Sequence, residues 1–130
     1  MPHDCFQVAL VEVVSRKVIG SGIDCLDLGS LTPIGDDGGF AISNTTFFHL
    51  PGGTIVSLSR TTIQPVETPT AGATHITGEV ADSQNILASQ GTGKFWNVEG
   101  STRLSGAVNL SRLGAENIVT FDCVFLIDLD

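Results

Sequence analysis

Short apolar runs separated by clusters of Gly, Pro, Asp and Asn follow one another along almost the whole chain. Apolar and polar side chains alternate within many of these runs, and helical periodicity is nearly absent, which is typical of successive β-strands. The pattern predicts strands over residues 5–14, 17–28, 40–50, 54–64, 73–80, 101–111 and 117–129. It also predicts a loop over 29–39, a tight turn over 51–53, a helical turn within 82–90 and a hairpin loop over 114–116.

The last predicted strand has the clearest alternation. Its apolar face carries Val119, Phe121, Cys123, Phe125, Ile127 and Leu129, and its mixed face carries Asp122 and Asp128. Two unlike faces fit a barrel wall with a core on one side and a different environment on the other. We therefore expect an all-β fold, an antiparallel up-and-down barrel of about seven or eight strands with a central cavity. The alternation leaves open which face points inward.

The composition agrees with this fold class. Fifteen glycines suit strands that bend and turn, and 42% hydrophobic residues supply enough apolar surface for a packed interior. A length of 130 residues is within the usual range for one domain, so we expect residues 1–130 to form a single β-barrel domain.

The charge balance disfavours two classes of partner. Six basic residues are scattered among fourteen acids, giving a net charge of −8. Nucleic acids and anionic membrane surfaces both require clustered Lys and Arg, so neither is expected as a partner. No apolar run is long enough for a transmembrane helix. We expect a cytoplasmic protein, or a secreted one if Met1 replaces a removed signal peptide.

The three cysteines, Cys5, Cys25 and Cys123, show no CxxC spacing, and each lies in an apolar strand. We expect them to be free thiols that behave as small buried hydrophobes. A disulfide between two of them would leave the third unpaired.

The C-terminal third contains Gly91, Gly93, Phe95 and Gly100, followed by an alternating strand and a phenylalanine-rich closing strand. This segment resembles the dirigent and allene oxide cyclase barrel superfamily, whose Gly-x-Gly-x-Phe turn is followed by Gly five residues later. The resemblance implies an eight-stranded barrel, commonly dimeric or trimeric, with a cavity and no metal or organic cofactor. It also implies an activity that steers a reactive intermediate to one stereochemical outcome.

Two positions depart from the plant dirigent pattern. Trp96 and Glu99 stand where those proteins usually carry Arg. The nearer analogy is therefore a bacterial or fungal cyclase-like member of the superfamily.

Three residues are candidates for catalysis. Asp122 lies in mid-strand, where a carboxylate is costly to bury unless it has a partner or a chemical task. Glu12 interrupts the first apolar strand, and Arg60 lies well inside a strand. Each also has a structural interpretation: an ion pair of Asp122 with Arg103, or simple exposure to solvent.

Five further residues are candidates for binding the substrate. Arg103 could orient an oxygen-bearing group, and Asn44 could donate hydrogen bonds inside a cavity. His49 lies near a strand end, and Phe125 is on the apolar face of the last strand. Trp96 follows the glycine-rich turn over residues 91–95, which we call the glycine corner. The histidines are dispersed, so no metal site is expected.

These observations support three competing hypotheses. The first is a cofactor-independent cyclase or isomerase that folds a mostly apolar, reactive small molecule inside the barrel. The second is a non-catalytic barrel that carries or scavenges such a molecule, and the third is a structural subunit with a solid interior. A carboxylate or Arg facing a cavity favours the first over the second.

Overall fold

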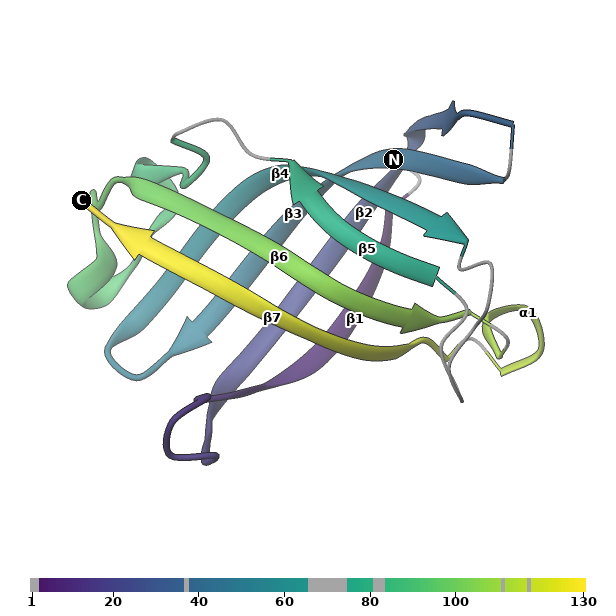
Figure 1. The fold of residues 1–130 in the computed structure, drawn as a ribbon. Coiled ribbons are helices and arrows are strands. Elements are labelled where there is room, and N and C mark those ends of the chain that lie inside the picture. The colour runs from purple at the N-terminus through teal and green to yellow at the C-terminus, as the bar shows by residue number, and fades with distance from the viewer. Residues whose placement is uncertain (1–2, 37, 66–74, 81–83, 111, 117) are drawn as a thin grey trace.

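The computed structural model describes residues 3–36, 38–65, 75–80, 84–110, 112–116 and 118–130. It contains one seven-stranded antiparallel sheet in which each strand pairs with its neighbour in the sequence (Figure 1). The strands are β1 (His3–Val11), β2 (Val18–Ile34), β3 (Gly39–Leu50), β4 (Gly53–Pro65), β5 (His75–Val80), β6 (Gly100–Asn109) and β7 (Thr120–Leu129). The expected all-β, up-and-down architecture is therefore confirmed.

The sheet is strongly curled and wraps around an interior (Figure 1). β1 and β7 are its two ends, and no backbone ladder joins them among the described residues. The barrel is thus open along one seam within the described part of the chain.

Strand β2 is longer than expected. The segment over 29–39 was predicted as a loop, but β2 continues to Ile34 and pairs Thr32 with Ala41 after an irregularity in register that follows Asp27. Among the described residues, the last residue of β2 that pairs with β1 is Asp27. Within this part of the chain β2 is an edge strand beyond Asp27, a position that tolerates Pro33.

The helical elements are short. Within the window 82–90, a 3₁₀ turn, η1, spans Ala88–Gln90, and residues 82 and 83 lie outside the described part of the chain. A second turn, η2, spans Gly93–Phe95, and a one-turn helix, α1 (Leu113–Glu116), replaces the expected hairpin loop. No helix in the described ranges could span a membrane.

The glycine corner packs against the β3–β4 turn. Gly93 has a positive φ of 60°, and a Cβ at this position would lie 2.1 Å from the carbonyl oxygen of Gly52. The amide of Lys94 donates to this same oxygen over 2.9 Å. Glycine at position 93 therefore permits both the backbone conformation and the close approach.

One end of the barrel is filled by an apolar plug. Its buried members are Phe48, Ile55 and Ile86, and partly buried side chains such as Phe125 pack against them. The rings of Phe48 and Phe125 meet edge to face, with centroids 4.9 Å apart. The phenylalanine-rich face of β7 therefore points inward.

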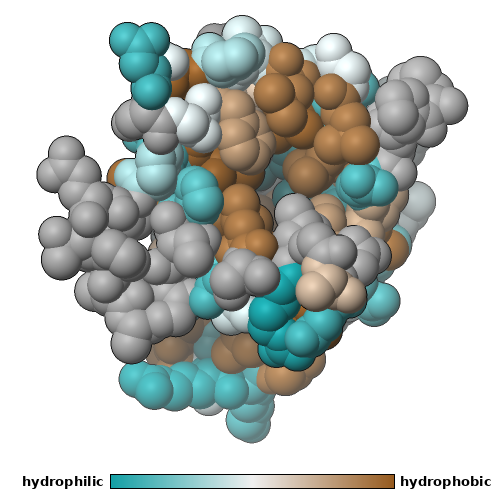
Figure 2. Space-filling view, turned by 90° about the vertical axis from the view of Figure 1, so that its right-hand side faces the viewer, coloured by the Kyte–Doolittle hydropathy of each residue, from teal (hydrophilic) through white to brown (hydrophobic). Residues whose placement is uncertain are grey.

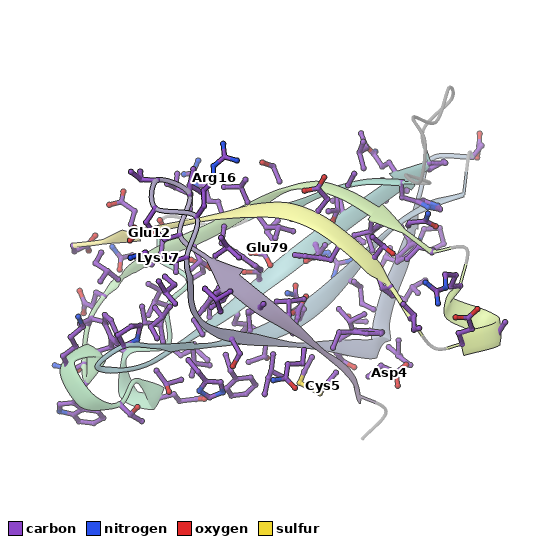
Figure 3. The ribbon with its side chains drawn as sticks, turned by 90° about the horizontal axis from the view of Figure 1, so that it is seen from below. Asp4, Cys5, Glu12, Arg16, Lys17 and Glu79 are labelled. Atoms are coloured by element: carbon purple, nitrogen blue, oxygen red, sulfur yellow. A yellow bond between two sulfur atoms is a disulfide. The ribbon has the colours of Figure 1, made fainter. Side chains whose placement is uncertain are left out.

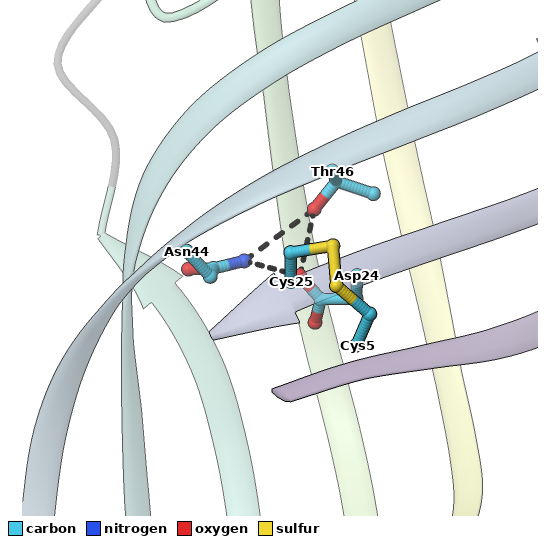
Figure 4. Close-up of a disulfide and its surroundings, with 5 residues drawn as sticks. All are labelled: Cys5, Asp24, Cys25, Asn44 and Thr46. Atoms are coloured by element: carbon cyan, nitrogen blue, oxygen red, sulfur yellow. Dashed lines mark hydrogen bonds between the residues drawn. A yellow bond between two sulfur atoms is a disulfide. The ribbon is translucent and has the colours of Figure 1, made fainter. Parts of the chain in front are cut away.

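The cysteines do not all remain free. Cys5 and Cys25 lie directly opposite each other on β1 and β2 and form a disulfide (Figures 3 and 4). The expectation of three free thiols is therefore wrong for these two. Cross-strand pairing brings the two side chains together, and this pairing depends on a register that spacing along the chain does not reveal. Cys123 is free and half-buried.

Candidate ligand cavity

A cavity of about 670 Å³ occupies the barrel on the other side of the plug. Its walls are mostly apolar and include Phe6, Leu26, Phe40, Ile63, Val108 and Phe121. Figure 2 looks at the end of the molecule near α1 and shows hydrophobic side chains gathered in the centre of that face. This volume is within the range of small-molecule sites, so the hypothesis of a solid interior does not hold for this protein.

Several polar residues of the cavity lie deep in the barrel. The inward-facing positions of β3 run from Phe40 and Ile42 through Asn44 and Thr46 to Phe48 of the plug. Thr46 lines the cavity together with Asp24 of β2 and Thr61 of β4. A molecule that fills the cavity therefore meets mostly apolar walls, with polar groups near the plug and also at Asp4 and Gln7 of β1.

Five polar residues at this inner end form one hydrogen-bonded group, which we call the carboxyl cluster: Asp24, Asn44, Thr46, Thr61 and Glu79. The amide nitrogen Nδ2 of Asn44 donates to Oδ1 of Asp24 over 2.8 Å and to Oε1 of Glu79 over 3.2 Å. Thr46 donates its hydroxyl to the same Asp24 oxygen over 3.1 Å, and Thr61 donates to Oδ1 of Asn44 over 2.7 Å. Figure 4 shows Asp24, Asn44 and Thr46 in this arrangement, beside the disulfide.

Burial changes the acidity of both carboxyl groups. Desolvation raises the pKa of Glu79 to about 7, and the nearby charge of Asp24 acts in the same direction. Desolvation also raises the pKa of Asp24, although its hydrogen bonds from Asn44 and Thr46 partly oppose the effect. Glu79 is therefore able both to donate and to accept a proton at neutral pH.

One atom of the cluster lacks a partner. Oε2 of Glu79 is buried and has no hydrogen-bond partner within normal bonding geometry among the described residues. The hydroxyl of Ser59 is close enough to lower the pKa of Glu79 slightly. Figure 3 shows Glu79 in the interior of the curled sheet. A buried polar atom of this kind is costly to leave unsatisfied, so a polar group that reached it would gain a hydrogen bond. Glu79 is not itself among the residues that line the cavity, and it is joined to the lining residue Asp24 through Asn44.

Cys123 is not a candidate nucleophile. Burial raises the pKa of its thiol to about 12, so the reactive thiolate is scarce at neutral pH. Among the described side chains no group of three or more His, Cys, Asp or Glu could hold a metal ion.

Two of the residues singled out in the sequence face the interior. Asn44 is 1% exposed and joins the two carboxyl groups, and Phe125 lines the cavity.

Three others lie on the outer face because side chains alternate along a strand. Asp122 is exposed on β7 between the inward Phe121 and Cys123. Arg103 is exposed on β6. Arg60 is half-buried on β4, where it donates a hydrogen bond to the hydroxyl of Ser43 over 3.3 Å. The structure therefore places neither the proposed acid Asp122 nor either arginine against the cavity.

The remaining three lie in turns or at strand ends. Glu12 follows β1 in an exposed turn, where its amide donates to the carbonyl of Lys17 over 2.9 Å (Figure 3). His49 is exposed and its Nδ1 lies 3.1 Å from the hydroxyl of Thr54. Trp96 is 63% exposed just after η2. None of the three is part of the cavity lining.

Sequence reasoning missed Asp24 and Glu79. Asp24 does carry a signal, because its same-face neighbours Gly22 and Leu26 are not polar and both line the cavity. Glu79 lies on the same face of its strand as Thr77, and two polar residues in alternation are typical of a face exposed to solvent. The inward direction of both faces becomes evident only from the assembled sheet.

Comparisons with known proteins do not assign this chain to a family. No protein-family model matches it, and no significant match is found among curated proteins or solved structures. Its function is therefore to be inferred from the cavity and the carboxyl cluster.

Proposed function

We propose that this protein is a cofactor-independent enzyme of the cyclase or isomerase type that binds a mostly apolar, reactive small molecule and steers its stereoselective cyclisation. One observation carries the proposal: a cavity with apolar walls ends on a carboxyl cluster that contains an acid with a pKa of about 7. A carboxyl group facing the cavity is the feature that favours an enzyme over a simple carrier.

Each part of the cavity has a task in such a reaction. The apolar walls hold the substrate in a folded conformation, which lowers the entropic part of the barrier to ring closure. Glu79 transfers a proton to or from the reacting group, and the carboxylate of Asp24 stabilises positive charge that develops there. Asn44 keeps both carboxyl groups in position through its single amide nitrogen.

The resemblance to the dirigent and allene oxide cyclase barrels supports the same proposal. Its implied properties, namely a cavity that directs a reactive intermediate and the absence of a cofactor, agree with a site built from carboxyl and amide groups. The homodimer or homotrimer that the resemblance implies is part of the proposal and depends on the resemblance alone.

The Cys5–Cys25 disulfide supports an oxidising compartment for this protein, because structural disulfides persist mainly outside the reducing cytosol. We therefore favour secretion over a cytoplasmic location.

The proposal is tested with the neutral, apolar dye N-phenyl-1-naphthylamine, whose fluorescence rises in an apolar site. Compounds that displace the dye are then incubated with the protein, and their conversion is followed by chromatography and mass spectrometry. We expect conversion that Glu79→Gln abolishes while dye binding persists. Displacing compounds that are all recovered unchanged would make the protein a carrier, and a dye that fails to bind would refute both.

A further inference from the structure

The charged side chains that line the cavity are all acidic. Among its described lining residues these are Asp4 on β1 and Asp24 at the inner end, and no Lys, Arg or His is present. Glu79 is not among the lining residues, but its hydrogen bond to Asn44 places it in the carboxyl cluster next to Asp24. The arginines of the neighbouring strands, Arg60 and Arg103, lie on the outer face. The cavity therefore has no positive charge to offer to an anionic ligand.

The two inner carboxyl groups are close together. Oδ1 of Asp24 and Oε1 of Glu79 accept hydrogen bonds from the same nitrogen of Asn44, at 2.8 and 3.2 Å. They are thus no more than about 6 Å apart, a distance at which one carboxylate disfavours the ionisation of another. A cation beside them would relieve this repulsion.

Both carboxyl groups retain an oxygen for such a cation. Oδ2 of Asp24 takes part in none of the hydrogen bonds that the described residues make with this side chain, all of which involve Oδ1. Oε2 of Glu79 is buried without a partner among the described residues. Asp24 itself lines the cavity, so its carboxyl group is directly accessible from within it.

Other ligand head groups fit this end of the cavity less well. A carboxylate or phosphate would bring a further negative charge to a desolvated pair of acids, which is strongly unfavourable. A neutral hydroxyl or carbonyl can form a hydrogen bond but does not compensate the charge of the two acids. An ammonium group donates hydrogen bonds and compensates the charge at the same time.

We propose that the molecule held in this cavity carries a basic nitrogen, whose ammonium group binds to Asp24 and Glu79 while its hydrocarbon part lies along the apolar walls. This inference rests on the proposed function, because it takes the cavity as the substrate site, and it adds the chemical class of the substrate.

Binding of an ammonium ion is coupled to a proton. The titratable group that acts on Glu79 is Asp24 from β2. Glu79 in turn raises the pKa of the Cys123 thiol on β7, which at about 12 remains neutral. A bound cation lowers the pKa of Glu79, so this side chain releases its proton. Because the pKa of Glu79 is about 7, binding near neutral pH is accompanied by release of a fraction of a proton for each molecule bound.

Three probes with the same hydrocarbon chain test the inference: decylammonium, decan-1-ol and decanoate. Their affinities are measured by titration calorimetry at pH 7 in two buffers of different ionisation enthalpy, and amide shifts in nuclear magnetic resonance spectra locate the bound probe. We expect decylammonium to bind at least about tenfold more tightly than decan-1-ol, with decanoate weakest. The measured enthalpy should depend on the buffer for decylammonium but not for decan-1-ol.

Matched variants separate the cavity from the overall charge of the protein. Asp24→Asn and Glu79→Gln each remove one acid at the cluster, whereas Asp122→Asn removes one acid on the outer face. Asp122→Asn thus removes at least as much negative charge as either cluster variant, because Glu79 is partly protonated near pH 7. The preference for decylammonium should decrease in the first two variants and persist in Asp122→Asn, with circular dichroism confirming that each variant is folded.

The outcomes distinguish this inference from the function on which it rests. Equal or tighter binding of decan-1-ol or decanoate in the cavity would overturn the basic-nitrogen inference and leave the ligand site intact. If both cluster variants keep the preference for decylammonium, the preference comes from the net charge of the protein, and the basic-nitrogen inference is overturned as well. If none of the three probes changes the chemical shifts of the backbone amides in the cavity lining, the proposed function itself is refuted. The relative affinities of the three probes for the wild-type protein test the inference even if a cluster variant does not fold.

Discussion

Asp24 and Glu79 lie on strands that are not neighbours in the sheet, yet their carboxyl oxygens accept hydrogen bonds from one nitrogen of Asn44. The curl of the sheet brings β2 and β5 to face each other across the interior. The chemistry of the cavity therefore depends on this tertiary contact between two acids and on the buried amide between them.

Removal of that amide should destabilise the fold. Asn44→Ala leaves the hydroxyl of Thr61 and both carboxyl groups without their partner, in a place where water is largely excluded. We expect the free energy of unfolding, measured by urea denaturation, to decrease by about 3 kcal/mol. Thr45→Ala, on the opposite face of the same strand, is the control and should cost less; equal losses would contradict a structural role for the cluster.

Stability should decrease as the pH rises towards neutrality. The pKa of Glu79 is about 7 in the folded state against 4.5 for an ordinary glutamate, so the folded state binds this proton more tightly than the unfolded state. The contribution of Glu79 to the free energy of unfolding is complete below pH 4.5 and is lost as the pH rises from there through about 7. Asp24 acts in the same direction, because its pKa is also raised.

Thermal unfolding between pH 4 and pH 8 measures this dependence. Glu79→Gln should flatten the profile, whereas Glu99→Gln, at an exposed position, should leave it as in the wild type. A Glu79→Gln profile as steep as that of the wild type would mean that Glu79 does not titrate in this range.

The disulfide should contribute substantially to stability. Cys5 and Cys25 are 20 residues apart in the sequence, and a crosslink of this span removes conformational freedom from the unfolded chain. We expect reduction with dithiothreitol to lower the free energy of unfolding by about 3 kcal/mol. The double variant Cys5→Ser, Cys25→Ser should be destabilised equally and should not respond to the reductant; a response in that variant would locate the effect elsewhere.

The glycine corner should reject a side chain for two separable reasons. Gly93 and Gly38 both have positive φ, 60° and 88°, but a Cβ at Gly93 would lie 2.1 Å from the carbonyl oxygen of Gly52, whereas Gly38 has open space. We expect Gly38→Ala to cost about 1 kcal/mol for backbone conformation alone. Gly93→Ala should cost about 3 kcal/mol or more in the same urea titration, and similar losses would show that the close approach is unimportant.

Alternation along the chain was sufficient to predict the strands and their up-and-down order. It succeeded for β7, because a strand with one wholly apolar face has a period of two that helices cannot imitate. It failed at the far end of β2, where the Pro- and Gly-rich composition suggested a loop although the residues pair with β3 at an edge.

The candidate site was predictable only in part. Asn44 was identified as a side chain that could donate hydrogen bonds inside a cavity, and the structure places it at the centre of the carboxyl cluster. Asp122 was singled out because a carboxylate in mid-strand is costly to bury, yet the alternation that makes Phe121 face inward makes Asp122 face outward. The pairing of Asp24 with Glu79, like that of Cys5 with Cys25, depends on register and curvature, which are properties of the assembled sheet.

The open seam between β1 and β7 affects what determines the internal width of the cavity. In a barrel closed by hydrogen bonds, strand number and stagger determine the circumference and hence the internal width. Here the described strands β1 and β7 share no ladder, so they can separate or approach while every backbone pair in the sheet is retained. The disulfide holds β1 to β2 during such a movement. The width of the cavity is therefore not fixed by a closed ring of hydrogen bonds between strands in the described part of the chain.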